Sequence, residues 1–177
     1  MADPRVEQSK ECLLEAELRL LERKPIDEIS VSELCKTAGI SRQTFYRLYS
    51  RKEDVLLERL QALLDEVYDA DGPVPSIEET IERLGAILER EGRFLRCAFQ
   101  SNLDFHIIHR FELLMKRLME EHEDDAYHEC MASFIAGGMY LTMKKWCIEG
   151  RSEEGWDYVE NIKQVAAPLV ESQRAEA

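Results

Sequence analysis

Apolar side chains recur at every third or fourth position along most of the chain, which is the spacing of one face of an α-helix. Residues 5–23 carry them at Val6, Cys12, Leu13, Ala16, Leu20 and Leu21. Residues 52–68 carry them at Val55, Leu56, Leu60, Leu63, Leu64 and Val67. No segment requires a β-strand to explain its pattern. The sequence therefore predicts an all-α protein with about nine helices.

Between these two stretches, the pattern predicts two short helices separated by a tight turn. Gly39 supplies the left-handed residue that ends the first helix, and Ser41 is suited to cap the second, which spans 42–48. Ser32 has a cap-like position ahead of the first helix, although Val31 could instead belong to its first turn. This arrangement is a helix-turn-helix, whose second helix lies in the major groove of DNA with its N-terminal residues on base edges.

A breaker segment at 70–76 precedes a longer helical region. Ser76 followed by Glu79 forms a capping box for the first helix after it. The remaining helices are predicted over 76–91, 93–100, 103–121 and 124–149, and from 152 onward. We therefore expect two domains: a three-helix DNA-binding domain over residues 1–51 and a helical domain over residues 52–177.

Charge is distributed unevenly along this acidic chain, whose formal net charge is −13. Residues 1–51 hold nine Lys or Arg and nine Asp or Glu, so residues 52–177 carry the whole acidic excess. The window 36–52 has five Lys or Arg and no acidic residue. Because an acidic protein is a poor non-specific binder of polyanions, we expect DNA binding through this local surface alone.

The second helix carries side chains suited to both kinds of DNA contact. Arg42 and Gln43 suit bidentate pairs with guanine and adenine, respectively. Side chains suited to phosphate oxygens are Ser41, Thr44, Tyr46 and Lys52. Phe45 and Leu48 lie on the opposite face and should pack into the core. The complete predicted DNA-contacting set is Ser32, Ser41, Arg42, Gln43, Thr44, Tyr46, Arg47 and Lys52.

Four short motifs within residues 10–57 point to one kind of DNA-binding domain. They are Ile29-Ser-Val31, Ala38-Gly-Ile-Ser41, Thr44-Phe-Tyr46 and Tyr49-x-x-Lys52-Glu-Asp54. Together with the initial amphipathic helix, they resemble the DNA-binding domain of the TetR/AcrR family of bacterial transcriptional regulators. The resemblance places the family's base-reading positions on Arg42 and Gln43. It places the family's phosphate-binding positions on Thr44, Tyr46 and Lys52. Tyr49 departs from the family, which more often has Phe there, but a bulky aromatic is retained.

The resemblance also implies a homodimer that reads a palindromic operator in double-stranded DNA. Gly137 and Gly138 lie in mid-helix, where small residues permit close approach of a second helix. Trp146 and Trp156 are large apolar anchors of the kind enriched at interfaces. Alternatively, the two glycines are packed within one subunit. The candidate interface residues are Phe134, Gly137, Gly138, Leu141, Trp146, Trp156, Val159 and Ile162.

Members of this family usually sense a small molecule within the C-terminal domain, so the resemblance implies such an effector here. The candidate pocket residues are Phe94, Cys97, Phe105, His109, Met115, Met119, Tyr127 and Met131. Methionines and aromatics at helical spacing are also typical of a plain core. We expect a repressor whose effector changes the separation of the two recognition helices. The alternative is a regulator, possibly an activator, that responds to a partner protein.

Other functional classes find little support in the sequence. Neither a catalytic triad order nor a phosphate-binding glycine loop is present, so we expect no enzyme and no cofactor. His106 and His109 have a spacing compatible with a metal, but no third strong ligand is evident, so no metal site is predicted. The five cysteines lack CxxC spacing, which argues against a disulfide framework. Without an apolar run of about 18 residues or a signal peptide, we expect a cytoplasmic protein that does not bind membranes.

Overall fold

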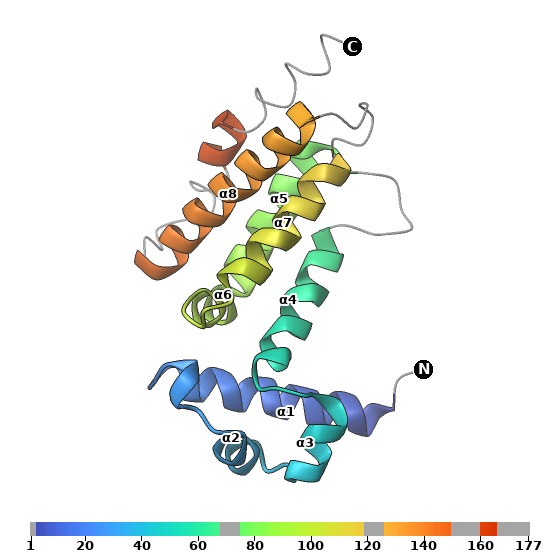
Figure 1. The fold of residues 1–177 in the computed structure, drawn as a ribbon, viewed down its shortest axis with the longest axis vertical. Coiled ribbons are helices and arrows are strands. Elements are labelled where there is room, and N and C mark those ends of the chain that lie inside the picture. Colours follow the sequence, from blue (N-terminus) through green and yellow to red (C-terminus); the bar gives the residue numbers. More distant parts are fainter. Residues whose placement is uncertain (1–2, 68–74, 119–125, 150–159, 166–177) are drawn as a thin grey trace.

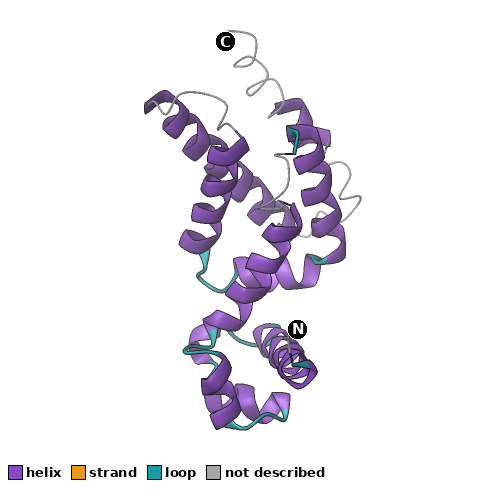
Figure 2. Ribbon diagram, turned by 90° about the vertical axis from the view of Figure 1, so that its right-hand side faces the viewer, coloured by secondary structure: helices purple, strands orange, loops and turns teal. Residues whose placement is uncertain are grey.

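The computed structural model describes residues 3–67, 75–118, 126–149 and 160–165. Its regular elements in these ranges are α1 (Pro4–Leu21), the 3-10 turn η1 (Ile26–Glu28), α2 (Val31–Ala38), α3 (Arg42–Leu48), α4 (Glu53–Val67), α5 (Ile77–Arg90), α6 (Gly92–Phe99), α7 (Asp104–Leu118) and α8 (Ala126–Glu149). Residues 160–165 are helical as well. The predicted all-α fold class is confirmed for the described part of the chain (Figure 2).

The helices form two groups that α1 and α4 connect. Figure 1 shows α1, α2 and α3 at one end of the molecule, and α4 leading from them to α5, α6, α7 and α8. Each group has its own buried cluster of apolar side chains. Leu14 and Leu21 of α1 pack against both clusters. A structural change among α5 to α8 can therefore be transmitted to α2 and α3 through α1 as well as through α4.

Local capping interactions explain where α2 ends and where α3 begins. Gly39 has φ 68°, a left-handed conformation that costs little only for glycine, and it closes α2. The Ser41 Oγ accepts a hydrogen bond from the Thr44 N–H at 3.0 Å, which fixes the start of α3. The bounds of α3 are those predicted from the sequence. The predicted capping box of Ser76 and Glu79 is confirmed as well.

The N-cap of α2 is Ser30 and not Ser32. Ser30 has an extended backbone, and its Oγ accepts from the Glu33 N–H at 3.1 Å. Ser32 is the second residue of the helix and its side chain is exposed. Ser30 is the cap because Val31 belongs to the first turn, which was the alternative left open.

Candidate nucleic-acid interface

One buried aromatic side chain holds α3 in place. Phe45 is fully buried, and its ring centroid lies 6.0 Å from that of Tyr49. Both rings belong to the apolar cluster that joins α1, α2 and the start of α4. With the Phe45 face in this cluster, the opposite face of α3 is turned to solvent. The side chains exposed on α3 are Arg42, Gln43, Tyr46 and Arg47.

The exposed cations of α3 are available to a ligand outside the chain. Among the residues that the structure describes, neither Arg42 nor Arg47 takes part in an ion pair. The Arg42 guanidinium carbon lies 6.0 Å from the Tyr46 ring centroid, at the outer limit of a cation–π contact. The Ser41 and Thr44 hydroxyls lie 2.9 Å apart at the first turn of the helix. Donors and positive charge therefore gather at the N-terminal part of α3.

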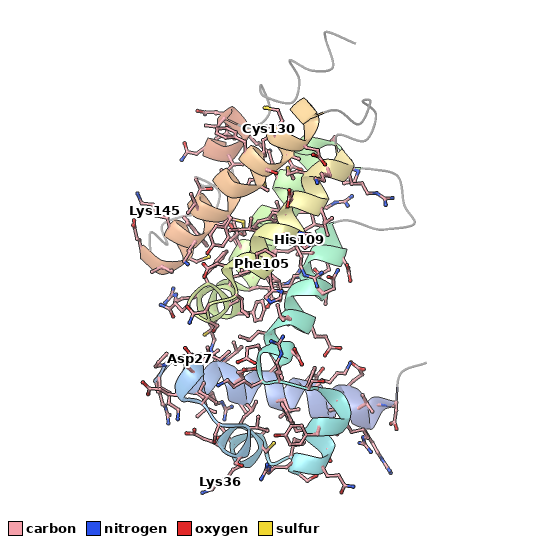
Figure 3. All side chains as sticks on the ribbon, viewed as in Figure 1. Asp27, Lys36, Phe105, His109, Cys130 and Lys145 are labelled. Atoms are coloured by element: carbon pink, nitrogen blue, oxygen red, sulfur yellow. The ribbon has the colours of Figure 1, made fainter. Side chains whose placement is uncertain are left out.

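Two further cations lie close to α3 in the chain. Lys36 of α2 is exposed, and Figure 3 places it at the end of the molecule away from α5 to α8. Arg51, which follows α3, is also exposed and pairs with Asp54 at 3.3 Å. This end of the molecule therefore presents positive charge from α2, from α3 and from the segment before α4.

Lys52 has partners inside the protein. Its ammonium donates to the Ile26 carbonyl at 2.6 Å and to the Ile29 carbonyl at 2.8 Å. The side chain is 16% exposed. α4 begins one residue after Lys52, although the sequence predicted Lys52 as its first residue. An ammonium has three N–H donors, so two carbonyls leave it one more for a phosphate. The phosphate contact of Lys52 stays a prediction.

A polar contact that the sequence did not reveal fixes the end of α3 to its neighbours. The Tyr49 hydroxyl donates to the Glu58 carboxylate, which also pairs with Lys10 of α1 at 2.5 Å. Burial and this hydrogen bond to Glu58 raise the pKa of Tyr49 well above its usual range. Tyr49 therefore remains a neutral donor, and it is packed into the domain.

The sequence of this region matches a known protein family. Residues 13–58 match the sequence model of the bacterial regulatory proteins of the tetR family. Residues 13–58 therefore carry the N-terminal domain of the TetR family. The HTH-type transcriptional regulator EthR of Mycolicibacterium smegmatis is 44% identical over 63 residues, which cover 36% of this chain and 29% of that protein. EthR of Mycobacterium tuberculosis is 39% identical over 71 residues, covering 37% and 33%, respectively. The chain thus spans about a third of the length of these relatives.

Solved structures share the fold over nearly the whole chain. The dihydroxyacetone kinase operon activator DhaS has a TM-score of 0.65 at 19% identity, covering 93% of this chain and 95% of its own. The protein Lin0861 of Listeria innocua reaches a TM-score of 0.71 at 19% identity, covering 96% and 94%. Thermus thermophilus FadR, a TetR-family repressor solved with lauroyl-CoA, has a TM-score of 0.56 at 23% identity, covering 88% and 92%. At these identities the likeness concerns the fold.

The structure brings some of the predicted pocket residues together and separates others. Phe94, Cys97 and Met115 are buried in the larger apolar cluster, and Met131 packs against it. Phe105 is 76% exposed and stacks on the exposed His109 ring at 6.1 Å (Figure 3). Phe105 and His109 are exposed because Ile107 and Phe111 occupy the side of α7 that faces the core, which turns the other side to solvent. Met119 and the Tyr127 side chain lie outside what the structure describes.

The candidate interface residues of α8 are mostly exposed. Phe134 and Leu141 are 69% and 64% exposed, and Gly138 is exposed as well. Within the described ranges, a Cβ added at Gly137 or Gly138 would meet no atom of another part of the fold within 4 Å. Contacts with the described part of the same subunit therefore do not account for the two glycines. Trp146 instead packs against the core and Ile162 is half-buried, whereas Trp156 and Val159 lie outside the described residues.

Two further features of the described ranges concern metal binding and membrane insertion. In the described ranges, no group of three or more His, Cys, Asp or Glu side chains is arranged to hold a metal ion, the surroundings of His106 and His109 included. Over the same ranges, no helix has the length and the apolar character needed to cross a bilayer.

Proposed function

We propose that this chain is a sequence-specific DNA-binding transcriptional regulator that acts in the cytoplasm as a homodimer on a palindromic operator. The observation that carries the proposal is the solvent-facing side of α3. Arg42 and Gln43 are exposed on this side, and buried Phe45 anchors the opposite side of the helix in the core. Arg42 and Gln43 are assigned to base edges. The phosphate contacts are assigned to Ser41, Thr44, Tyr46 and Lys52, with Ser32 and Arg47 at the edge of the site.

Selection of DNA by the protein itself tests this proposal. The purified chain is mixed with a pool of random double-stranded DNA, and bound duplexes are recovered, sequenced and footprinted. We expect an inverted repeat whose half-sites lie about 34–36 Å apart, because a two-fold dimer presents two recognition helices at that spacing. Recovery of no enriched sequence, or of a single unrepeated site, would contradict the proposed dimeric DNA-binding function.

Replacing Arg42 by alanine should weaken binding to the selected duplex by about 1–3 kcal/mol and relax its preference at one base pair. Fluorescence anisotropy on the selected duplex and on single-base variants of it measures both effects. Arg19→Ala is the matched control, because Arg19 is an exposed arginine of α1 away from α3. Tyr46→Phe should weaken binding to all duplexes alike. An Arg42→Ala protein with unchanged preference would refute the base-reading assignment.

We infer that α8 forms the dimer interface. Phe134, Leu141 and Ile148 recur every seven residues and are all exposed, so they form one apolar stripe along α8. Gly138 lies between the first two and leaves open space in which a partner helix can approach closely. Large exposed apolar side chains in a row are typical of protein interfaces.

Leu141→Glu should convert the dimer to a monomer at micromolar concentration, because it places a charge in the middle of the apolar stripe. Analytical ultracentrifugation measures the change in mass. Phe105→Glu is the matched control, since Phe105 is an equally exposed apolar residue on α7 outside this stripe. We expect Phe105→Glu to stay dimeric. Equal behaviour of the two variants would argue against α8 as the interface.

We further propose that the regulator is a repressor that a small-molecule effector releases from DNA. The support is a neighbour of the same fold, FadR, which was solved with lauroyl-CoA bound. Control by a partner protein is the second candidate, and the exposed Phe105 and His109 pair favours it. The neighbour DhaS is an operon activator, which supports activation in place of repression. Lauroyl-CoA is the first probe in a thermal-shift screen. An effector should raise Tm and lower DNA affinity, whereas co-purification of a second protein without any ligand response would favour the other candidate.

A further inference from the structure

Glu17 is a buried carboxyl group on α1, at the junction of the helix-turn-helix with the rest of the molecule. The residue is 0% exposed. Among the residues that the structure describes, neither of its carboxylate oxygens has a hydrogen-bond partner. An ionised carboxylate in such a place is strongly disfavoured, so burial raises the pKa of Glu17 to about 8. A group with this pKa changes its charge near neutral pH.

Charged and titratable groups from three other parts of the fold face Glu17. They are Tyr49 after α3, Lys52, Glu53 and Asp54 at the start of α4, and Cys97 of α6. After burial, repulsion by Glu53 is the next cause of the raised pKa, and attraction by Lys52 opposes it. Glu17 therefore senses the charge balance at the start of α4, where Lys52 is a predicted phosphate contact.

Histidine, the usual sensor of neutral pH, is absent from this half of the chain. The first histidine is His106, which lies in α7 of the larger helical group. Ordinary carboxylates and lysines titrate well below and well above neutrality. Glu17 can therefore make the charge of the DNA-binding domain depend on pH near neutrality, which no histidine in that domain can do.

We propose that DNA binding by this protein is coupled to the protonation of Glu17, so that the DNA-bound form keeps the carboxyl neutral. The inference rests on the DNA-binding function proposed above. A phosphate that approaches Lys52 brings negative charge closer to Glu17 and offsets part of the electrostatic attraction between Lys52 and the ionised carboxylate. Binding of DNA therefore favours the protonated carboxyl, and by linkage the ionised carboxyl weakens DNA binding. A rise in pH then acts as a releasing signal.

DNA affinity measured against pH at constant salt tests this coupling. The probe is the duplex that the wild-type protein selects from a random pool, and salt is held fixed because it dominates DNA affinity. If bound DNA raises the pKa of Glu17 by about one unit, the dissociation constant of the wild type should rise about threefold between pH 6.5 and 8.5. Glu17→Gln, which mimics the neutral acid, should lose this rise.

Glu11→Gln is the matched control, because it removes the same formal charge from an exposed position on α1. It should keep the pH dependence of the wild type. If Glu17→Gln does not fold, Glu17→Ala removes the carboxyl without adding a buried polar group. A pH dependence shared by wild type, Glu17→Gln and Glu11→Gln would overturn the coupling while leaving DNA binding intact. Absence of DNA binding by the wild type would overturn the proposed function and this coupling together.

The titration of Glu17 is also measurable without DNA. Carboxyl carbon chemical shifts in the free protein report the pKa of Glu17 directly, with Glu17→Gln identifying its resonance. We expect a carboxyl that is mostly protonated at pH 7. An ionised Glu17 at that pH would overturn the coupling independently of any DNA measurement.

Discussion

Replacing Phe45 by alanine should destabilise the DNA-binding helices by about 3–5 kcal/mol, the cost of removing a fully buried phenylalanine. Phe45 lies in the cluster that holds α1, α2 and α3 together, and its ring touches the Tyr49 ring. That cluster is small, so little remains to hold α3 once the ring is lost. Urea unfolding followed by circular dichroism should show these helices unfolding at a lower urea concentration than in the wild type. Hydrogen exchange should show α3 amides losing protection before those of α7.

Tyr46→Ala is the matched control for Phe45→Ala. Tyr46 is the next residue on the same helix, also aromatic, but it is exposed. Its ring is 52% exposed and contacts the Phe45 ring edge-on at a centroid distance of 5.3 Å, so its removal should cost about 0.5–1.5 kcal/mol, less than the loss of Phe45. Tyr46→Ala should therefore weaken DNA binding without unfolding the domain, whereas Phe45→Ala should lose both. Similar stabilities for the two variants would mean that Phe45 does not hold α3.

The sequence predicted α3 to the residue because its ends depend on local chemistry. Gly39 takes the left-handed conformation and Ser41 caps the helix, and neither needs a distant partner. The start of α4 was less predictable. There the Asp54 carboxylate accepts the N–H groups of Ser50 at 3.1 Å and Arg51 at 2.8 Å, which caps the helix, and the helix itself begins at Glu53. A single sequence does not show which of several polar residues makes such a contact.

Contacts between helices were harder to predict than the helices themselves. Periodicity shows that α7 has an apolar side, but Phe105 and His109 were assigned to a pocket and lie on the opposite, exposed side. The partners of Lys52, the carbonyls of Ile26 and Ile29, are 26 and 23 residues away in sequence, respectively. Such long-range contacts depend on how helices pack, which spacing along one helix does not determine.

Glu17 was missed although the pattern contained a signal for it. It lies among Leu13, Ala16 and Leu20, at the three- and four-residue spacing of the buried side of α1. A charged residue at such a position either reaches solvent or is buried with a changed pKa. A glutamate is usually exposed to solvent, whereas this position in the helical pattern indicated burial. In the structure Glu17 is buried, because other helices cover that side of α1.

Glu17→Gln should change the pH dependence of folding stability. The carboxyl has an ordinary pKa of 4.5 in the unfolded chain and about 8 in the folded one. Between these values the unfolded chain ionises while the folded chain keeps its proton, so wild-type stability falls as pH rises from about 4.5 to about 8. The accumulated loss is on the order of 3 kcal/mol by pH 7. Glutamine does not titrate, so this loss should be absent from the variant.

Urea unfolding at several pH values measures this effect as the stability difference between Glu17→Gln and the wild type. The difference at pH 5 serves as the baseline, because it contains any cost of burying the glutamine amide. From there the difference should shift steadily in favour of the variant up to about pH 8 and then level off. Glu11→Gln, at an exposed site, should show no such trend. A constant difference between Glu17→Gln and the wild type would mean that Glu17 is ionised in the folded protein, and its burial would then need a cation close enough to compensate.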